Sequence, residues 1–154
     1  MARIREPLVG QSIMERLSEA YEQPNTQAAS LRVLKEAIRR DLEAVLNTRR
    51  QMGAELDGYS QAVGSVLNYG VEDLSSLRAD PEGYLLQMQR AVQKCVMEYE
   101  PRLADISVTV QDAQIEVREI RLHIEAQLIL SRTGERVFFD TIFDVSRETY
   151  SVGS

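Results

Sequence analysis

Three carboxylates close together in the sequence, Glu98, Glu100 and Asp105, are the residues whose type and spacing could support catalysis. Two acidic side chains that flank a bound sugar can hydrolyse it, one as general acid and the other as base or nucleophile. The chain has 24 acidic residues, however, so some close pairs arise by chance. We therefore expect no enzyme, and a peptidoglycan-cleaving, lysozyme-like glycosidase stays the alternative function.

The single histidine and the single cysteine are the other candidates for chemistry. His123 lies between apolar residues of an alternating segment, which is typical of a surface or cross-strand residue of a β-strand. Cys95 falls in a helical apolar stripe, where a thiol is buried and unreactive. One His and one Cys are too few for a zinc site, which draws on several such ligands. We expect no catalytic residue, no metal and no cofactor.

The strongest local feature is Glu100-Pro101-Arg102, where a proline separates a carboxylate from a guanidinium. Proline restricts the backbone, so the two charges leave this elbow in defined directions. Two interpretations stay open. The elbow is either an internal clamp, in which Arg102 pairs with a nearby acid or Glu100 caps a turn, or a surface that binds another protein.

Length and composition indicate one cytoplasmic globular domain. The chain has 154 residues, 44% of them hydrophobic and 27% charged, as in an ordinary single domain. No apolar run is long enough to cross a bilayer, and the N-terminus lacks a signal-peptide core. The net charge of −6 argues against a nucleic-acid binder. We expect residues 1–11 to form a flexible arm and residues 12–154 to form the domain.

Three helices are predicted in the first two thirds of the chain. Ser12 to Glu15 has the capping-box pattern, which predicts a short helix with Ile13 and Leu17 facing inward. Ser30 is the expected cap of a longer helix that ends near residues 47–50. Its apolar stripe is Leu31, Leu34, Ile38, Leu42 and Val45. Residues 51–79 read as an irregular, functional loop.

Asp80-Pro81 predicts the start of a third helix, which Pro101 ends. Its buried stripe is Leu85, Met88, Val92, Cys95 or Val96, and Tyr99. Beyond it, apolar residues alternate with polar ones over residues 106–110, 120–130 and 137–145, with a hairpin connection at 131–135. Helices followed by an antiparallel sheet make the fold class α+β. The strand at 120–130 either lies at an edge that could accept a partner strand or is internally paired, and we favour the second.

Several segments together resemble the TssE-type baseplate subunit of bacterial type VI secretion systems, whose family includes the small wedge protein of contractile phage tails. Residues 41–50 read DLEAVLNTRR, residues 65–74 read SVLNYGVEDL and residues 99–103 read YEPRL. Glu72 stands where the family usually has proline, and Tyr99 where it has phenylalanine. Residues 139–141 resemble the family's penultimate strand. The likeness runs over residues 12–152.

The resemblance implies a sheath-core-like fold and a baseplate docked at the inner face of the inner membrane. It also implies binding to the TssF and TssG wedge subunits through Tyr99, Glu100, Pro101 and Arg102, and strands on which the TssB/TssC sheath begins. The other matching segments supply the remaining partner-binding candidates, which are Arg49, Arg50, Asn68, Tyr69 and Gly70. The family also carries the label "lysozyme-like", which suggests an enzyme. The residues of this chain provide no acid–base pair that would support that activity.

Overall fold

The computed structural model describes residues 13, 17, 24, 26–50, 58–63, 65–74, 81–114, 118–129 and 134–153. The helical elements are α2 (Gln27–Leu46), α3 (Ser60–Val63), the 3-10 turn η2 (Val66–Asn68) and α4 (Pro81–Tyr99). The strands that follow are β1 (Leu103–Gln114), β2 (Glu119–Leu128), β3 (Arg136–Asp144) and β4 (Thr149–Val152). The predicted α+β class is confirmed. The predicted arm at residues 1–11, the capping box and the Asp80 cap lie outside the described residues.

Helix α2 begins four residues earlier than predicted. Thr26 has an extended backbone and its hydroxyl accepts a hydrogen bond from Ala29 N at 3.2 Å, so Thr26 is the N-cap. The prediction of Ser30 as the cap was wrong, because residues 27–29 are good helix formers that extend the helix back to Thr26. Ser30 is buried within the first turn. The helix ends at Leu46, as expected, and its predicted apolar stripe packs in the core.

The prediction that Ile13 and Leu17 face inward was wrong. They are joined by a helical hydrogen bond from Leu17 N to Ile13 O at 3.0 Å, but their exposed fractions are 73% and 75%. Apolar spacing reports which side chains share a helix face, and not whether another element covers that face. The segment predicted as an irregular loop contains α3 and η2 among its described residues.

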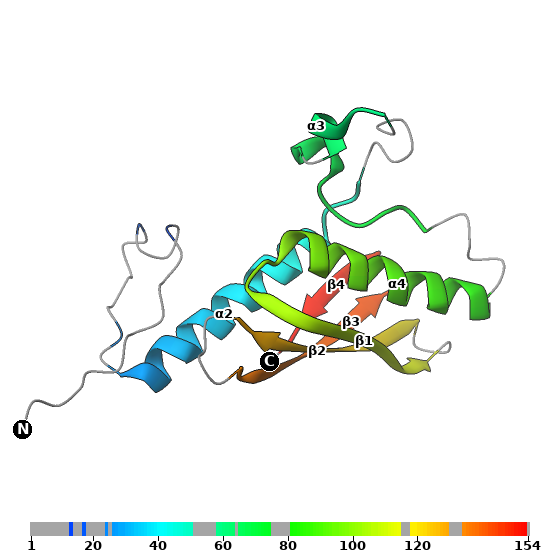
Figure 1. The fold of residues 1–154 in the computed structure, drawn as a ribbon. Coiled ribbons are helices and arrows are strands. Elements are labelled where there is room, and N and C mark those ends of the chain that lie inside the picture. The colour runs from blue at the N-terminus through cyan, green and yellow to red at the C-terminus, as the bar shows by residue number, and fades with distance from the viewer. Residues whose placement is uncertain are drawn as a thin grey trace, which may run out of the picture.

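Helix α4 follows the prediction closely. Its buried side chains include Met88, Val92, Cys95 and Val96, so both alternatives for the stripe are buried. The helix ends at Tyr99, and Pro101 lies in the turn that leads into β1. Because this connection is short, β1 runs back along α4 (Figure 1).

The four strands form one antiparallel sheet in the order β1-β2-β3-β4. The internal pairing favoured for residues 120–130 is confirmed, since β2 lies between β1 and β3. His123 is a cross-strand residue, as predicted. Its Nδ1 lies 2.7 Å from Asp140 Oδ1, and its ring stacks on Phe138 with centroids 5.6 Å apart.

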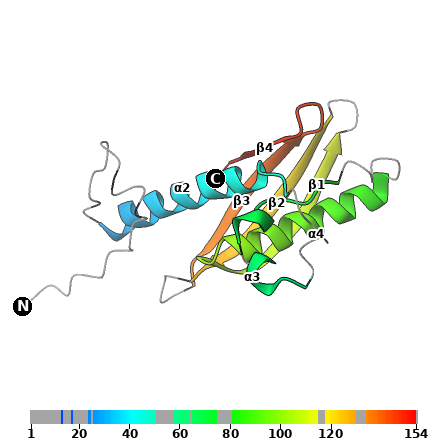
Figure 2. The same cartoon turned by 90° about the horizontal axis from the view of Figure 1, so that it is seen from above.

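Helices α2 and α4 lie on one face of the sheet (Figure 1). Along β2 and β3 every second side chain is buried, and these side chains meet the apolar stripes of the two helices. The most fully buried large side chains include Phe139, Ile38, Leu42, Val92 and Ile124. Seen from above, α4 runs beside β1, and α2 crosses the other end of the sheet toward β4 (Figure 2).

Candidate partner-binding site

The elbow between α4 and β1 is an internal clamp. Arg102 Nε donates to Glu100 Oε1 at 2.6 Å, and Arg102 Nη2 also contacts Glu100 Oε2. The same Nη2 donates to Asp41 Oδ2 of α2 at 2.5 Å. Glu100 is only 3% exposed. The structure therefore contains the internal clamp, which was the first of the two interpretations of the sequence. This clamp connects the elbow to α2.

Hydrogen bonds from Arg102 to Glu100 hold the pKa of the guanidinium above its usual value, and the bond to Asp41 adds to this. The Arg102 backbone N–H also donates to Glu100 Oε1 at 3.2 Å. A planar guanidinium can satisfy both oxygens of a buried carboxylate, which an ammonium cannot do. Pro101 lies between the two charges and is exposed.

Tyr99 and Glu98 join the elbow to the 65–74 segment. Tyr99 Oη donates to Asn68 O at 2.5 Å, and its ring meets the Tyr69 ring edge-on, with centroids 4.9 Å apart. Glu98 Oε1 accepts from Asn68 Nδ2 at 3.3 Å. Burial raises the pKa of the Tyr99 hydroxyl, and the Glu98 charge raises it further. Tyr99, Asn68 and Tyr69, predicted from separate motifs, are thus in contact.

Gly70 lets the chain pass close to the end of α2. Its φ is +106°, and a Cβ there would lie 2.2 Å from the Thr48 carbonyl oxygen. Val71 N donates to Thr48 O and Arg50 N donates to Val71 O, both at 2.8 Å. Only glycine has both this backbone conformation and this clearance.

The two arginines after α2 point to different partners. Arg50 forms an ion pair with Glu98 at 3.3 Å, and its side chain is only 9% exposed. Arg49 pairs with Glu148, in the turn between β3 and β4. Arg50 therefore belongs with the Tyr99 and Asn68 contacts, and Arg49 does not.

A cavity of about 290 Å³ opens where α2 meets the elbow. Its lining includes Tyr69, Tyr99, Glu100, Pro101 and Arg102, together with Asp41 and Ala44 of α2. Five of the nine predicted site residues therefore border one surface hollow. We call it the elbow groove.

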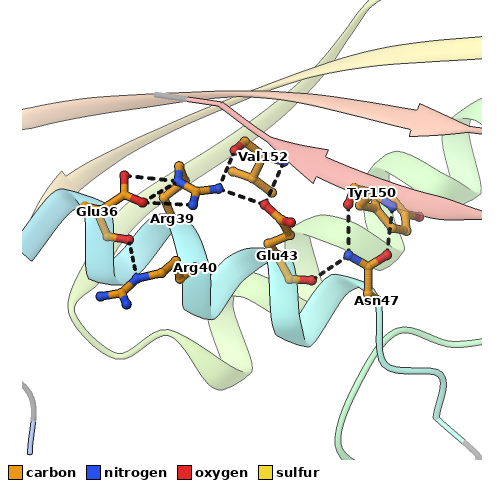
Figure 3. Close-up of polar contacts among 7 residues, drawn as sticks. All are labelled: Glu36, Arg39, Arg40, Glu43, Asn47, Tyr150 and Val152. Atoms are coloured by element: carbon orange, nitrogen blue, oxygen red, sulfur yellow. Dashed lines mark hydrogen bonds and ion pairs between the residues drawn. The ribbon is translucent and has the colours of Figure 1, made fainter. Parts of the chain in front are cut away.

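Sequence reasoning missed two features. Val66 and Leu67 of η2 expose 83% and 52% of their surface. The second feature is a row of polar α2 side chains, Arg39, Glu43 and Asn47, along the outer edge of β4 (Figure 3). Their spacing of four residues places them on one helix face, and this was a signal in the sequence.

The α2 row binds the backbone of β4. Asn47 Nδ2 donates to Tyr150 O and Asn47 Oδ1 accepts from Tyr150 N, both at 2.8 Å. Arg39 Nη1 donates to Val152 O at 2.9 Å, and Glu43 Oε2 accepts from Val152 N at 3.4 Å. Side chains thus take the hydrogen bonds that a fifth strand would otherwise make.

The candidate catalytic carboxylates serve other contacts. Glu98 pairs with Arg50, Glu100 pairs with Arg102, and Asp105 lies in a bulge of β1 with a φ of +50°. Within the described ranges, no cluster of three His, Cys, Asp or Glu residues could hold a metal ion. The helices described here include none that is both long and apolar enough to span a membrane.

Comparison with known families supports the resemblance of the motifs. The profile of the baseplate wedge protein gp25 family matches residues 32–133, which include most of α2, the elbow, β1 and β2. A search of curated proteins finds no match. Since the profile matches well over half of the chain, and the α+β architecture and elbow lie within that match, the protein belongs to the gp25 family of baseplate wedge proteins.

Proposed function

We propose that this protein is the TssE-type structural subunit of a type VI secretion baseplate, which binds TssF and TssG at the elbow groove and carries the first TssB/TssC sheath ring by strand addition. The observation that carries the proposal is the gp25-family match over a segment that contains the elbow. The subunit would act without catalysis, in a baseplate at the inner face of the inner membrane.

The elbow groove has properties that suit a partner-binding site. The clamp holds its wall in one conformation, since three charged side chains, one from α2 and two from the elbow, are bound together. A preformed wall costs a partner little ordering entropy. Exposed Pro101 and the half-buried rings of Tyr69 and Tyr99 offer apolar contact beside the charges.

The charges of the clamp are directed mainly inward, so the groove would bind through its shape and rim. Glu100 is buried against Arg102 and has little surface left for a partner. Asp41 is 59% exposed and Arg102 is 22% exposed, so these two side chains can also reach a partner. We infer that Glu100 positions Arg102, and that Arg102, Asp41 and Pro101 form the contact surface.

A substitution in the groove that spares the clamp tests this proposal. Ala44 is exposed and lines the groove, and Ala28 is exposed near the other end of α2. Ala44→Arg should place a long charged side chain in the groove and abolish co-purification with TssF and TssG. Ala28→Arg makes the same chemical change elsewhere on the helix and should bind normally.

Retained binding by a folded Ala44→Arg protein would refute the groove as the wedge contact. Failure of the wild-type protein to co-purify any wedge subunit from its host would refute the baseplate role itself. The glycosidase alternative is tested by the turbidity of a peptidoglycan suspension. Clearing that Glu100→Gln removes would overturn the non-enzymatic assignment.

A further inference from the structure

The clamp fixes one half of the wall of the elbow groove, and a second set of contacts fixes the other half. That other half is the ring pair of Tyr69 and Tyr99. We propose that the Glu98 carboxylate is the positioning residue for this ring pair, and that Arg50 and Asn68 act through Glu98 and do not touch the partner. The effect on partner binding rests on the proposed function, whereas the contacts of Glu98 rest on this chain alone.

The Glu98 carboxylate joins three segments of the chain. Its Oε2 accepts from Arg50 Nη2 at 3.3 Å, just beyond the end of α2. Its Oε1 accepts from Asn68 Nδ2 of η2, also at 3.3 Å. The Tyr99 hydroxyl, which donates to Asn68 O at 2.5 Å, lies 3.1 Å from the same Oε1. Glu98 therefore links the end of α2, the η2 turn and the last residue of α4.

Arg50 is a buried anchor and not a surface contact. Its side chain is 9% exposed, whereas that of Glu98 is 31% exposed. Among the described residues, Arg50 Nε has no hydrogen-bond partner. A buried guanidinium that loses its carboxylate is strongly unfavourable, so loss of the Glu98 charge should displace Arg50. Because Arg50 N donates to Val71 O at 2.8 Å, such a displacement would reach the segment that carries Tyr69.

Asn68 is likewise directed into the protein. It is 7% exposed, and both its side-chain amide and its backbone oxygen are bound to residues at the end of α4. Tyr69 is the next residue, and its ring meets the Tyr99 ring edge-on. The position of the ring pair therefore depends on how Asn68 is held. This is why we assign Asn68 to positioning, although the sequence predicted a contact with the partner.

The segment around α3 projects from the layer that α2 and α4 form (Figure 1). Its attachments to that layer include the contacts of Asn68 with Glu98 and Tyr99, and the backbone bonds of Val71 with Thr48 and Arg50. Without the Glu98 contacts, the ring pair should spend part of the time outside the binding conformation. A partner then binds more weakly in proportion to the fraction of molecules that remain competent.

A positioning residue and a contact residue differ in their effect on binding kinetics. If Glu98 sets only the fraction of molecules whose groove is ready to bind, its loss lowers the association rate constant and leaves dissociation nearly unchanged. Loss of a direct contact mainly raises the dissociation rate constant. The two rate constants together therefore distinguish the two roles.

Amide hydrogen exchange on the isolated protein tests the positioning role without any partner. In Glu98→Gln, whichever way the new amide turns, its NH₂ group faces a donor of either Arg50 or Asn68. The N–H groups of Val71 and Arg50, both bonded at the base of the segment, should exchange at least roughly tenfold faster. The N–H of Leu42, within α2, should not change.

Two further variants complete the exchange experiment. Tyr99→Phe removes the hydroxyl and keeps the ring, and it should accelerate the exchange of Val71 even if Glu98→Gln does not fold. Glu36→Gln removes the same charge from an ion pair with Arg39 that does not line the groove, and it should leave Val71 unchanged. Unchanged exchange of Val71 in Tyr99→Phe and in a folded Glu98→Gln protein would overturn the proposal.

Binding to a purified TssF–TssG complex tests the effect on the partner. Glu98→Gln should lower the association rate constant about fivefold or more, with the dissociation rate constant within about twofold of the wild type. Tyr69→Ala, which removes one of the rings, should chiefly raise the dissociation rate constant. A higher dissociation rate constant with unchanged association in Glu98→Gln would show a direct contact and refute the positioning role, as would unchanged binding.

A remote destabilising variant separates positioning from a general loss of stability. Asn47→Ala removes contacts between α2 and β4, and Asn47 does not line the groove, so the folded variant should bind as the wild type does. Slower association in Asn47→Ala as well would refute a specific role of Glu98. Failure of the wild type to bind TssF–TssG would refute the proposed function and the role of Glu98 in binding, and exchange would still decide whether Glu98 holds the segment.

Discussion

The side-chain amide of Asn47 pairs with the backbone of Tyr150 as a neighbouring strand would, donating to its oxygen and accepting from its nitrogen at 2.8 Å each. Asn47 also caps α2, with its backbone N–H and its Nδ2 both bound to Glu43 O. One residue therefore ends a helix and covers a strand edge.

Asn47→Ala should lower the free energy of unfolding by about 1–3 kcal/mol, because it leaves a half-buried backbone pair without partners. Asn47→Asp should not restore stability, since a carboxylate would face the Tyr150 carbonyl. Urea unfolding measures both. Arg32→Ala, an exposed change on the same helix, is the control and should stay within about 0.5 kcal/mol of the wild type. Equal effects of Asn47→Ala and Arg32→Ala would contradict the edge contact.

The clamp should behave as a coupled unit in a double-mutant cycle. Arg102→Ala should cost about 3–5 kcal/mol, because it leaves the buried Glu100 carboxylate without its cation. Glu100→Ala should cost less, since Arg102 is partly exposed and keeps Asp41. The double variant should be more stable than the sum of the two losses predicts, with a coupling of about 0.5–3 kcal/mol. Urea unfolding of the four proteins gives the coupling.

Arg102→Lys should recover little of the stability that Arg102→Ala loses, because lysine cannot bind both Glu100 oxygens and Asp41 in the same geometry. Full recovery by lysine would show that charge alone holds the elbow. Strictly additive losses in the cycle would show that no clamp operates in solution.

Gly70 and Gly58 form a natural comparison, since their φ angles are +106° and +102°. A Cβ at Gly58 meets nothing within 4 Å, whereas one at Gly70 meets Thr48 O at 2.2 Å. Gly58→Ala should cost about 1–2 kcal/mol from backbone strain. Gly70→Ala should cost clearly more, because it also separates Val71 from Thr48. Thermal melts of the two variants measure the difference, and equal losses would contradict the close approach.

Cys95 should resist alkylation in the folded protein. It is buried in α4, and burial raises the pKa of its thiol to about 12. Iodoacetamide at pH 8 should therefore modify it only after unfolding, since the thiolate is the reactive form. Mass spectrometry with and without urea measures this, and rapid modification of the native protein would contradict the burial.

The same shift predicts alkaline destabilisation. A thiol whose pKa is raised in the folded state contributes its stability below the pKa of the unfolded chain, near 9, and loses it as the pH rises toward 12. The slope for this group is at most about 1.4 kcal/mol per pH unit. Burial also raises the pKa values of Tyr69, Tyr99 and Tyr150, which act in the same direction. Urea midpoints from pH 8 to pH 11 should fall, and less steeply in Cys95→Ala.

Local sequence patterns predicted the main elements of this protein. Steps of three and four residues identified α2 and α4, alternation identified β1 to β3, and Pro101 marked the end of α4. These features depend on neighbours within one turn or one strand, and such interactions can be read directly from the sequence. The order of the motifs also identified the family. The structure brings two of these motifs together, since Tyr99 Oη donates to the backbone oxygen of Asn68.

Tertiary structure alone decided what the local patterns left open. Glu100-Pro101-Arg102 fitted a clamp and an interface equally well, and the clamp depended on Asp41 lying 61 residues away in sequence yet 2.5 Å from Arg102 in space. Ile13 and Leu17 had a core-like spacing, but no element covers them within the described residues. The cover on the β4 edge depended on α2 packing beside that strand. A side chain's role is determined by what covers it, and that is a property of the packed chain as a whole.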